Sequence, residues 1–268
     1  MIMCGSCGCE SESLAIKITN MAHHEHSHPD GTPHHHHQEE REHTLAIKEN
    51  VMQHNDLLAA QNRGYLKAKR IFTLNLVSSP GAGKTTLLEK TISLLKSELN
   101  FYVIEGDQQT LNDALRIEKT GVPVVQINTG NGCHLDAQMV SHAIDTLHVK
   151  EESILVIENV GNLVCPAMFD LGETKRVVIV SVTEGEDKPL KYPNMFASAD
   201  VCIISKVDLL PHLIFDFEKL VENARKVNPK ITIIEYSAFT HDDKWKTWIK
   251  NEFDTYINAS TKDTRVTF

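Results

Sequence analysis

The stretch Ser79-Pro80-Gly81-Ala82-Gly83-Lys84-Thr85-Thr86 decides the fold, because it separates an apolar run at 71–78 from an amphipathic pattern at 84–99. A strand, a glycine-rich turn and a helix in this order are typical of a phosphate-binding loop, although Ser78 stands where the general motif has glycine. Glycines let backbone N–H groups approach phosphate oxygens, the helix N-terminus favours negative charge, and the Lys84 ammonium reaches the β- and γ-phosphates. The Thr85 hydroxyl is placed to bind Mg²⁺. We therefore expect a nucleotide site in which Lys84 is also catalytic, formed by Gly81, Ala82, Gly83, Lys84, Thr85 and Thr86; a glycine-rich turn that binds no phosphate is the alternative.

Outward from this loop, apolar β-branched runs alternate with helical patterns. Strands are expected at 71–78, 101–105, 124–127, 153–158, 176–182, 201–205 and 231–236, and helices at 84–99, 112–119, 135–147, 215–227 and 243–257. This alternation predicts an α/β fold, a mostly parallel sheet with helices on both faces, as in P-loop NTPases. In such sheets ligands bind beyond the carboxyl ends of the strands. We expect a GTPase domain at 71–258 and a C-terminal tail at 259–268. The pattern Leu45, Ile47, Val51, Leu57 and Leu58 indicates a helical lead-in at 44–70 that docks on this domain.

Charge and hydropathy restrict the class of protein. The 268 residues carry a formal net charge of −9, which argues against a nucleic-acid partner. Because no run of 18 apolar residues and no signal peptide is present, we expect no membrane span and a cytoplasmic location. Thiols stay reduced there, so the six cysteines are expected to be ligands or core residues rather than disulfides.

The N-terminal 43 residues contain few large apolar side chains, so we expect a disordered tail at 1–43. Within it, Cys4-x-x-Cys7-x-Cys9 supplies three soft ligands for Ni²⁺, Zn²⁺ or Cu⁺; a redox pair or unused thiols are the alternative. The tail is also rich in imidazoles, which predict a weak store of Ni²⁺ or Zn²⁺, with an expression tag as the alternative. These histidines are His23, His24, His26, His28, His34, His35, His36 and His37.

Two acidic elements follow strands at the nucleotide edge. Glu158-Asn159-Val160-Gly161 ends the strand at 153–158, so Glu158 is expected to hold Mg²⁺ and the Gly161 N–H to sense the γ-phosphate. Asp107 ends the strand at 101–105 and faces the same crevice. We expect Asp107 to orient water or Mg²⁺, a catalytic role, with a simple turn aspartate as the alternative.

Base choice is read from Ser205-Lys206-Val207-Asp208. The Asp208 carboxylate can accept from guanine N1–H and the 2-amino group, whereas adenine would leave it unpaired. The Lys206 stem is expected to lie along the base, and Ser237 and Ala238 to meet guanine O6 through backbone N–H. Ser205 replaces the commoner asparagine, and its shorter side chain leaves contact with the phosphate loop open.

A second metal site is expected where Cys133 and His134 follow the third strand and Cys165 follows Gly161. Two thiolates and an imidazole suit Ni²⁺ or Zn²⁺, while a buried cysteine with a helix-capping histidine is the alternative; Cys202 is expected in the core. Three ligands leave the sphere incomplete, so a second copy, water or a partner protein would complete it. Because Cys165 follows a segment expected to move when the γ-phosphate is lost, metal affinity should depend on the nucleotide.

Several segments together resemble the hydrogenase nickel-incorporation GTPase (HypB) family, of the signal-recognition-particle/MinD class of P-loop proteins. They are the phosphate loop at 77–86, which makes Ser78 a family trait, Asn131-Gly132-Cys133-His134-Leu135, the run 158–166 and the cysteine motif from Met3. The resemblance spans about Thr44 to Ile257. It implies a GTP-dependent homodimer with Ni²⁺ or Zn²⁺ on Cys133, His134 and Cys165 near the interface. It also implies nickel transfer, with a small zinc-containing metallochaperone, to the large subunit of a [NiFe]-hydrogenase. Ser205, and a cysteine motif that starts at Met3 rather than after the initiator, depart from the family pattern; Met3 is an alternative start.

Other functions remain as alternatives. A urease nickel-insertion GTPase would show Cys-Pro-His, whereas this chain has Cys165-Pro166-Ala167. A GTPase chaperone for cobalamin enzymes would not need the cysteines and histidines, a nickel store would carry a vestigial GTPase, and an ATP-dependent kinase would not need Asp208. We expect slow hydrolysis, because no glutamine follows Gly161 and only Arg116 and Arg176 are candidate arginine fingers.

Overall fold

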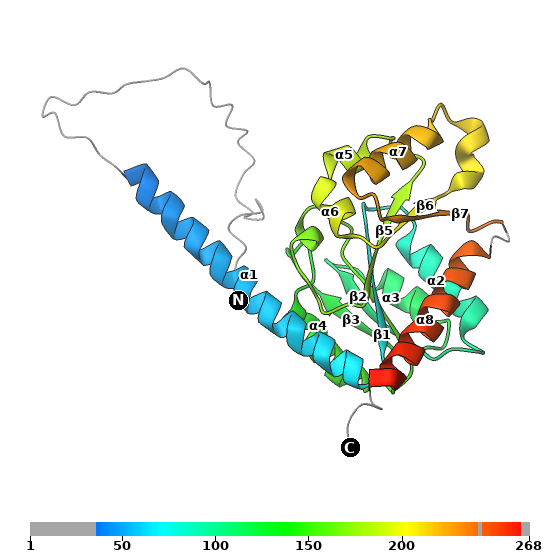
Figure 1. Cartoon of the computed structure of the whole chain (residues 1–268), viewed down its shortest axis with the longest axis horizontal. Coiled ribbons are helices and arrows are strands. Elements are labelled where there is room, and N and C mark those ends of the chain that lie inside the picture. Colours follow the sequence, from blue (N-terminus) through cyan, green and yellow to red (C-terminus); the bar gives the residue numbers. More distant parts are fainter. Residues whose placement is uncertain (1–35, 241–242, 264–268) are drawn as a thin grey trace, which may run out of the picture. The chain divides into compact units, whose positions relative to one another are not determined.

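The computed structural model describes residues 36–240 and 243–263 (Figure 1). The described residues from His54 onward form one compact unit, which contains the seven-stranded sheet. The tail ligands Cys4, Cys7 and Cys9, and the histidines from His23 to His35, lie outside the described residues. The tail as a metal-binding segment therefore stays a prediction.

The sheet has seven strands in the order β3-β2-β4-β1-β5-β6-β7, and every neighbouring pair is parallel. This arrangement confirms the predicted α/β class. Long β-branched runs form these strands because both faces of a parallel sheet are covered. The strands are β1 (Phe72–Ser78), β2 (Phe101–Asp107), β3 (Val124–Asn128), β4 (Ile154–Glu158), β5 (Lys175–Ser181), β6 (Val201–Ser205) and β7 (Thr232–Tyr236).

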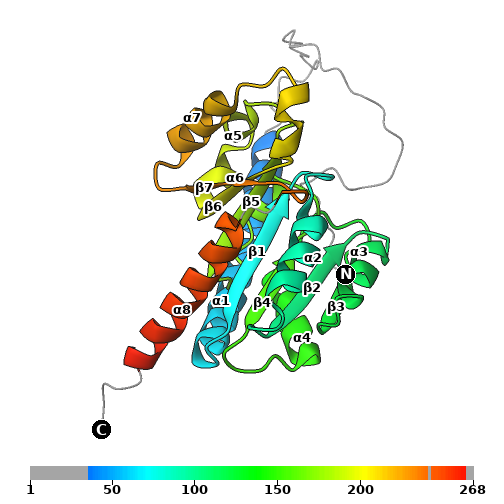
Figure 2. The same ribbon diagram turned by 90° about the vertical axis from the view of Figure 1, so that its right-hand side faces the viewer.

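Helices cover the two faces, and the alternation of side chains along β1 shows which core each face contributes. Leu74 and Leu76 pack with α2 (Lys84–Leu95), α3 (Asn112–Glu118) and α8 (Lys244–Asp263); Figure 2 shows these three helices together on one side. Val77 points to the opposite face, where the core includes Cys202, Met195 and Phe196. The prediction that Cys202 belongs to the core is confirmed. The helices whose residues line this second core are α6 (Pro193–Ser198) and α7 (Phe217–Val227).

The N-terminal helix begins earlier than predicted, and it docks through residues other than its apolar pattern. Helix α1 runs from His36 to Ala68, so it begins before Thr44, and the end of the segment predicted to be disordered is helical. Glutamine, glutamate and arginine favour helix, and no proline follows Pro33 there. Leu57, part of the apolar pattern that indicated the helix, is 66% exposed. Within 51–68, the part of α1 whose burial is described, the buried residues are Asn55, Ala59, Asn62 and Leu66, spaced to share one helix face.

Short elements escaped the sequence analysis. They are the 3-10 helices η1 (Cys165–Ala167) and η2 (Val207–His212) and the helix α5 (Lys188–Lys191), together with α6. Helix α4 (Ala137–Leu147) was predicted, and Asp136 caps it by accepting a hydrogen bond from Met139 N. Helix α8 continues to Asp263, beyond the predicted end at Ile257 and into the predicted C-terminal tail.

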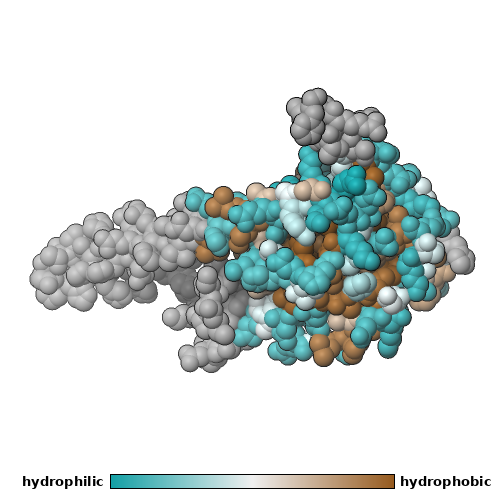
Figure 3. Space-filling model, turned by 90° about the horizontal axis from the view of Figure 1, so that it is seen from below, coloured by the Kyte–Doolittle hydropathy of each residue, from teal (hydrophilic) through white to brown (hydrophobic). Residues whose placement is uncertain are grey.

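Hydrophilic residues on the face shown in Figure 3 are interspersed with smaller hydrophobic areas. Among the described residues, no helix combines the length and the hydrophobicity needed to cross a membrane.

Candidate nucleotide and metal site

The loop between β1 and α2 has the backbone that its glycines predict. Gly81 and Gly83 have φ of +75° and +101°, in the left-handed region where glycine is favoured. The Lys84 ammonium donates to Ser78 Oγ at 3.0 Å. Burial lowers the pKa of Lys84, while Glu158 and other nearby carboxylates act in the opposite direction. Ser78 therefore gives this lysine a partner at the position where the general motif has glycine.

Glu158 and the phosphate loop meet at the predicted magnesium position. The Thr85 hydroxyl donates to Glu158 Oε1 at 2.6 Å. The other oxygen, Oε2, is buried and has no hydrogen-bond partner among the described residues. Burial raises the pKa of Glu158, against the effect of Lys84. A hydroxyl and an unsatisfied carboxylate so close together fit the hard oxygen ligands of Mg²⁺, although binding there stays a prediction.

Glu105 is a second buried carboxyl that the sequence analysis did not single out. It lies opposite Glu158 in the β2–β4 pairing and is 2% exposed. Its Oε2 has no hydrogen-bond partner among the described residues. Burial, reinforced by Glu158 and Asp107, raises the pKa of Glu105 to about 8. The only signal in the sequence was its place two residues before Asp107.

Asp107 is engaged within its own turn. Its Oδ1 accepts from Gln108 N at 2.7 Å, and its Oδ2 accepts from Thr110 N at 2.9 Å and from the Thr110 hydroxyl at 2.6 Å. Burial raises its pKa, but these hydrogen bonds outweigh burial and the pKa lies below its ordinary value. The structure therefore contains the alternative, an aspartate that stabilises its own turn. A role of Asp107 with water or Mg²⁺ stays a prediction.

The segment predicted to read the base, 205–208, bonds to the phosphate loop in two places. The Ser205 hydroxyl donates to Ala82 O at 2.6 Å, so serine does make the contact that was left open. Lys206, with φ of +61°, donates from Nζ to Gly81 O at 2.8 Å.

Asp208, whose carboxylate is predicted to read guanine, has a side-chain hydrogen-bond donor. Ser237 Oγ donates to Asp208 Oδ1 at 2.6 Å. This hydrogen bond orients the carboxylate, so Ser237 has a side-chain role besides the predicted backbone contact.

Of the two candidate arginines, one is held within the fold and the other bonds to the helix that follows the phosphate loop, and a lysine lies beside the loop. Arg176 is 8% exposed and is held by Glu173, so its candidacy as an arginine finger is wrong. Arg116 bonds to Glu89 Oε2 at 2.7 Å and to Thr86 Oγ1 at 3.1 Å. Lys188, which no motif pointed to, donates to Ser79 Oγ at 3.1 Å from helix α5.

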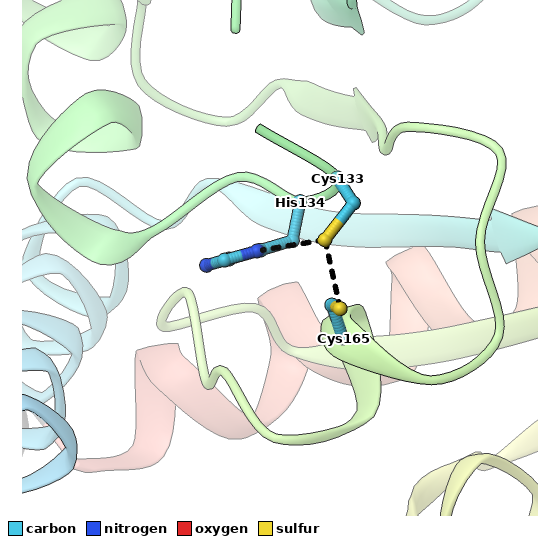
Figure 4. A group of neighbouring side chains, drawn as sticks. All are labelled: Cys133, His134 and Cys165. Atoms are coloured by element: carbon cyan, nitrogen blue, oxygen red, sulfur yellow. Dashed lines mark hydrogen bonds between the residues drawn. The ribbon is translucent and has the colours of Figure 1, made fainter. Parts of the chain in front are cut away.

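The three predicted ligands Cys133, His134 and Cys165 come together (Figure 4). Their ligand atoms all lie within 4.8 Å of one another. The Cys133 thiol donates to Cys165 Sγ at 2.8 Å and lies 3.7 Å from His134 Nδ1. The first two residues come from the β3–α4 loop and the third from η1, so the cluster joins segments that follow two different strands.

His134 is held by an aromatic neighbour that the sequence analysis missed. Its ring stacks on Phe169, with 3.9 Å between the ring centroids. Burial lowers the pKa of His134, against a smaller effect of Asp136. A neutral imidazole has a lone pair for a metal ion, so the cluster has the donors that a soft divalent cation prefers.

Asn159 connects the metal cluster to the nucleotide edge. It follows Glu158 directly, is 1% exposed, and its Oδ1 accepts from Leu135 N at 3.2 Å. A Cβ on Gly161, two residues further on, would lie 3.2 Å from Pro80 of the phosphate loop. The segment 158–161 therefore contacts both the phosphate loop and the loop that carries His134.

Comparison with known proteins now gives the family. A family model described as CobW/HypB/UreG, nucleotide-binding domain, matches residues 72–235. The chain belongs to this family. It is 56% identical over 217 residues to the hydrogenase maturation factor HypB of Azotobacter vinelandii, with 80% of this chain and 72% of the relative covered. A HypB from Helicobacter pylori, described as a hydrogenase/urease maturation factor, is 41% identical over 198 residues, with 72% and 81% covered.

Two solved HypB structures have folds similar to that of this chain. The HypB of Archaeoglobus fulgidus has a TM-score of 0.71 at 37% identity and covers 75% of this chain and 99% of its own. The HypB of Helicobacter pylori, solved in complex with nickel, has a TM-score of 0.69 at 38% identity, with 80% and 98% covered. The resemblance to HypB is confirmed, while the signal-recognition-particle/MinD class stays a prediction.

Proposed function

We propose that this chain is a GTP-hydrolysing, nickel-binding metallochaperone that assists nickel insertion into a [NiFe]-hydrogenase. The observation that carries the proposal is the cluster of Cys133, His134 and Cys165 within 4.8 Å, joined through Leu135 N and Asn159 to the segment that follows Glu158. A metal site and a nucleotide site thus share one stretch of backbone. The relatives named hydrogenase maturation factor HypB support the same assignment.

The nucleotide half of the proposal rests on the phosphate loop and on base choice. The loop N–H groups and Lys84 bind the phosphates, and Asp208, oriented by Ser237, accepts from guanine. Mg²⁺, when bound by Thr85 and Glu158, neutralises phosphate charge. Hydrolysis is slow, because the described residues place no glutamine after Gly161 and Arg176 is committed to structure.

The metal half rests on donor chemistry. Two thiolates and a neutral imidazole hold Ni²⁺ or Zn²⁺, and a fourth ligand comes from water, a second copy or a partner. We propose that GTP favours a homodimer, and that a small nickel/zinc metallochaperone and the hydrogenase large subunit are the partners. Coupling is reciprocal, so metal must change nucleotide affinity by the factor by which nucleotide changes metal affinity.

Nickel and zinc stoichiometry measured with GDP and with a non-hydrolysable GTP analogue tests this proposal. A chain with Cys4, Cys7 and Cys9 replaced by serine should bind one thiolate-ligated metal ion, and adding Cys133→Ser with Cys165→Ser should abolish that thiolate ligation while GTP binding persists. Equal metal affinities in the two nucleotide states would refute the switch. Thiolate-ligated metal that survives both serine substitutions in this chain would refute the site.

A storage function is the second candidate, favoured by the many histidines between His23 and His37. Deletion of residues 1–35, which precede α1, distinguishes a role of the tail in nickel insertion from a role in nickel storage. Loss of hydrogenase maturation that persists in nickel excess assigns the tail to insertion. Rescue by added nickel assigns it to storage. The Helicobacter pylori relative's name includes urease, so urease activity should be assayed in parallel.

A further inference from the structure

Two buried asparagines of α1 bridge the segments that carry the metal ligands. Asn55 and Asn62 are 4% and 5% exposed and lie on one face of the helix. Asn55 Oδ1 accepts from Ala137 N at 2.9 Å, and its Nδ2 donates to Asp170 O at 2.8 Å. Ala137 follows the loop of Cys133 and His134, and Asp170 follows Cys165 along the chain. One side chain thus bonds to both ligand-bearing segments.

Asn62 repeats the bridge further along the same helix face. Its Nδ2 donates to Ala137 O at 2.8 Å and to Leu171 O at 3.1 Å. Together the two amides bond both the N–H and the C=O of Ala137 and two consecutive carbonyls of the other segment. The two segments are therefore joined to each other through α1 at two successive levels.

The 170–172 turn is shaped for this close approach. A Cβ on Gly172, whose φ is +89°, would lie 2.7 Å from Ala59 O and 2.8 Å from Asn62 Cβ. Any other residue would push the turn off the helix. Arg63 also pairs with Asp170, with 2.6 Å between Nη2 and Oδ2. The contact is thus specific in backbone, in side-chain amides and in charge.

Hydrogen bonds differ from apolar packing in being directional, so they fix where two segments lie rather than merely holding them together. Buried amides without partners are costly, and leucine would serve at 55 and 62 if attachment alone were needed. We infer that Asn55 and Asn62 are positioning residues that set the separation of the Cys133–His134 pair from Cys165 and hence the nickel affinity of that site. This inference rests on the proposed metal-binding function.

The test uses the full chain with Cys4, Cys7 and Cys9 replaced by serine, so that the thiolate-to-nickel charge-transfer band reports the inner site. Asn55→Leu and Asn62→Leu remove the bridges while keeping the number and branching of the side-chain heavy atoms. Asn55→Asp keeps an acceptor for Ala137 N and loses the donor to Asp170 O. We expect each leucine variant to raise the nickel dissociation constant about 10- to 100-fold, the size seen when groups that orient metal ligands are changed, and to shift the band. Asn55→Asp should fall between wild type and Asn55→Leu.

Asn228→Leu is the matched control. Asn228 donates to Phe196 O and Ala199 O and accepts from Lys230 N, and none of these partners belongs to a ligand-bearing segment. It should lower the thermal midpoint of the metal-free chain about as much as Asn62→Leu, yet keep nickel affinity within about twofold of wild type, since no orienting contact to the metal ligands is lost.

Three results decide the inference. Wild-type nickel affinity and band in both leucine variants would overturn it, and so would an equal loss of affinity in Asn228→Leu, because the effect would then be general destabilisation. If a leucine variant does not fold, wild-type affinity in Asn55→Asp overturns the inference in the same way. A band that persists after Cys133→Ser with Cys165→Ser would instead refute the proposed site itself.

Discussion

Replacing Asn159 with leucine should weaken the coupling between nucleotide binding and metal binding. The side chain is buried, its Oδ1 accepts from Leu135 N at 3.2 Å and Val160 N at 2.9 Å, and its Nδ2 donates to Asn75 Oδ1 at 3.3 Å. Leucine has the same number and branching of side-chain heavy atoms but makes none of these bonds. The bond to Leu135 N is the one that joins the segment after Glu158 to the His134 loop.

The size of the effect follows from the bonds that are lost. A single hydrogen bond contributes about 1 kcal/mol net, which corresponds to about fivefold in an equilibrium constant. We therefore consider the nickel affinity with the GTP analogue divided by the nickel affinity with GDP. In Asn159→Leu this ratio should be about fivefold closer to one than in the wild type. Three buried groups left without partners cost about 1 kcal/mol or more each, so the free energy of unfolding should fall by about 3 kcal/mol.

Nickel titration against a chromophoric competitor, with each nucleotide in turn, measures this ratio. Guanine-nucleotide titration with and without nickel must give the same factor, because coupling free energies are reciprocal. Asn162→Leu is the control, since Asn162 Oδ1 accepts from Val164 N within its own segment. An undiminished ratio in Asn159→Leu, or an equal loss in Asn162→Leu, would refute the reasoning.

Three further predictions concern the nucleotide edge. Asp208→Asn should move the preference from guanosine to xanthosine nucleotides, because an amide NH₂ can donate to the added carbonyl; competition binding checks this. Ser205→Ala removes the 2.6 Å bond to Ala82 O and should weaken GTP binding about fivefold, the equivalent of one hydrogen bond, whereas Ser205→Asn should restore it. The third prediction concerns pH: burial raises the pKa of Glu105 to about 8, so the folded chain holds a proton that the unfolded chain releases above its ordinary pKa of 4.5. The free energy of unfolding should therefore fall as pH rises from about 4.5 to about 8, by at most about 1.4 kcal/mol per pH unit. Urea unfolding in the presence of a chelator measures this fall. Glu105→Gln should flatten the fall, whereas Glu118→Gln, at an exposed position, should leave it unchanged.

The sheet was predictable because its strands are long apolar runs bounded by motifs. The predicted strand at 71–78 is β1, Phe72–Ser78, and the strand at 201–205 agrees at both ends. Short helices were not predictable in this way: α5 has four residues, too few for a helical period to show. Its Lys188 therefore went unnoticed, although it reaches Ser79.

The parallel arrangement of the strands was enough to predict which residues of the site lie at the same edge of the sheet. Parallel strands end at one edge, so Thr85 and Glu158 could be expected to meet there, and they do. The orientation of each side chain was not predictable, because it depends on neighbours from other strands. Glu105 shows this: its raised pKa arises from burial and from Glu158 on the adjacent strand, and nothing in its local sequence indicates either.

The geometry of the metal site depends on asparagines for a related reason. Buried and exposed asparagines look alike in a periodicity analysis, and only their partners distinguish them. The bonds of Asn55 and Asn62 to the two ligand-bearing segments span between 75 and 115 residues of sequence. Apolar contacts alone would attach α1 and leave the two segments free to shift, whereas four directional bonds fix both against one rigid helix. The geometry of the cluster, whose ligand atoms lie within 4.8 Å of one another, then depends on α1 as much as on the loops that supply Cys133, His134 and Cys165. A chain that kept all three ligands but lost this helix face should hold nickel poorly.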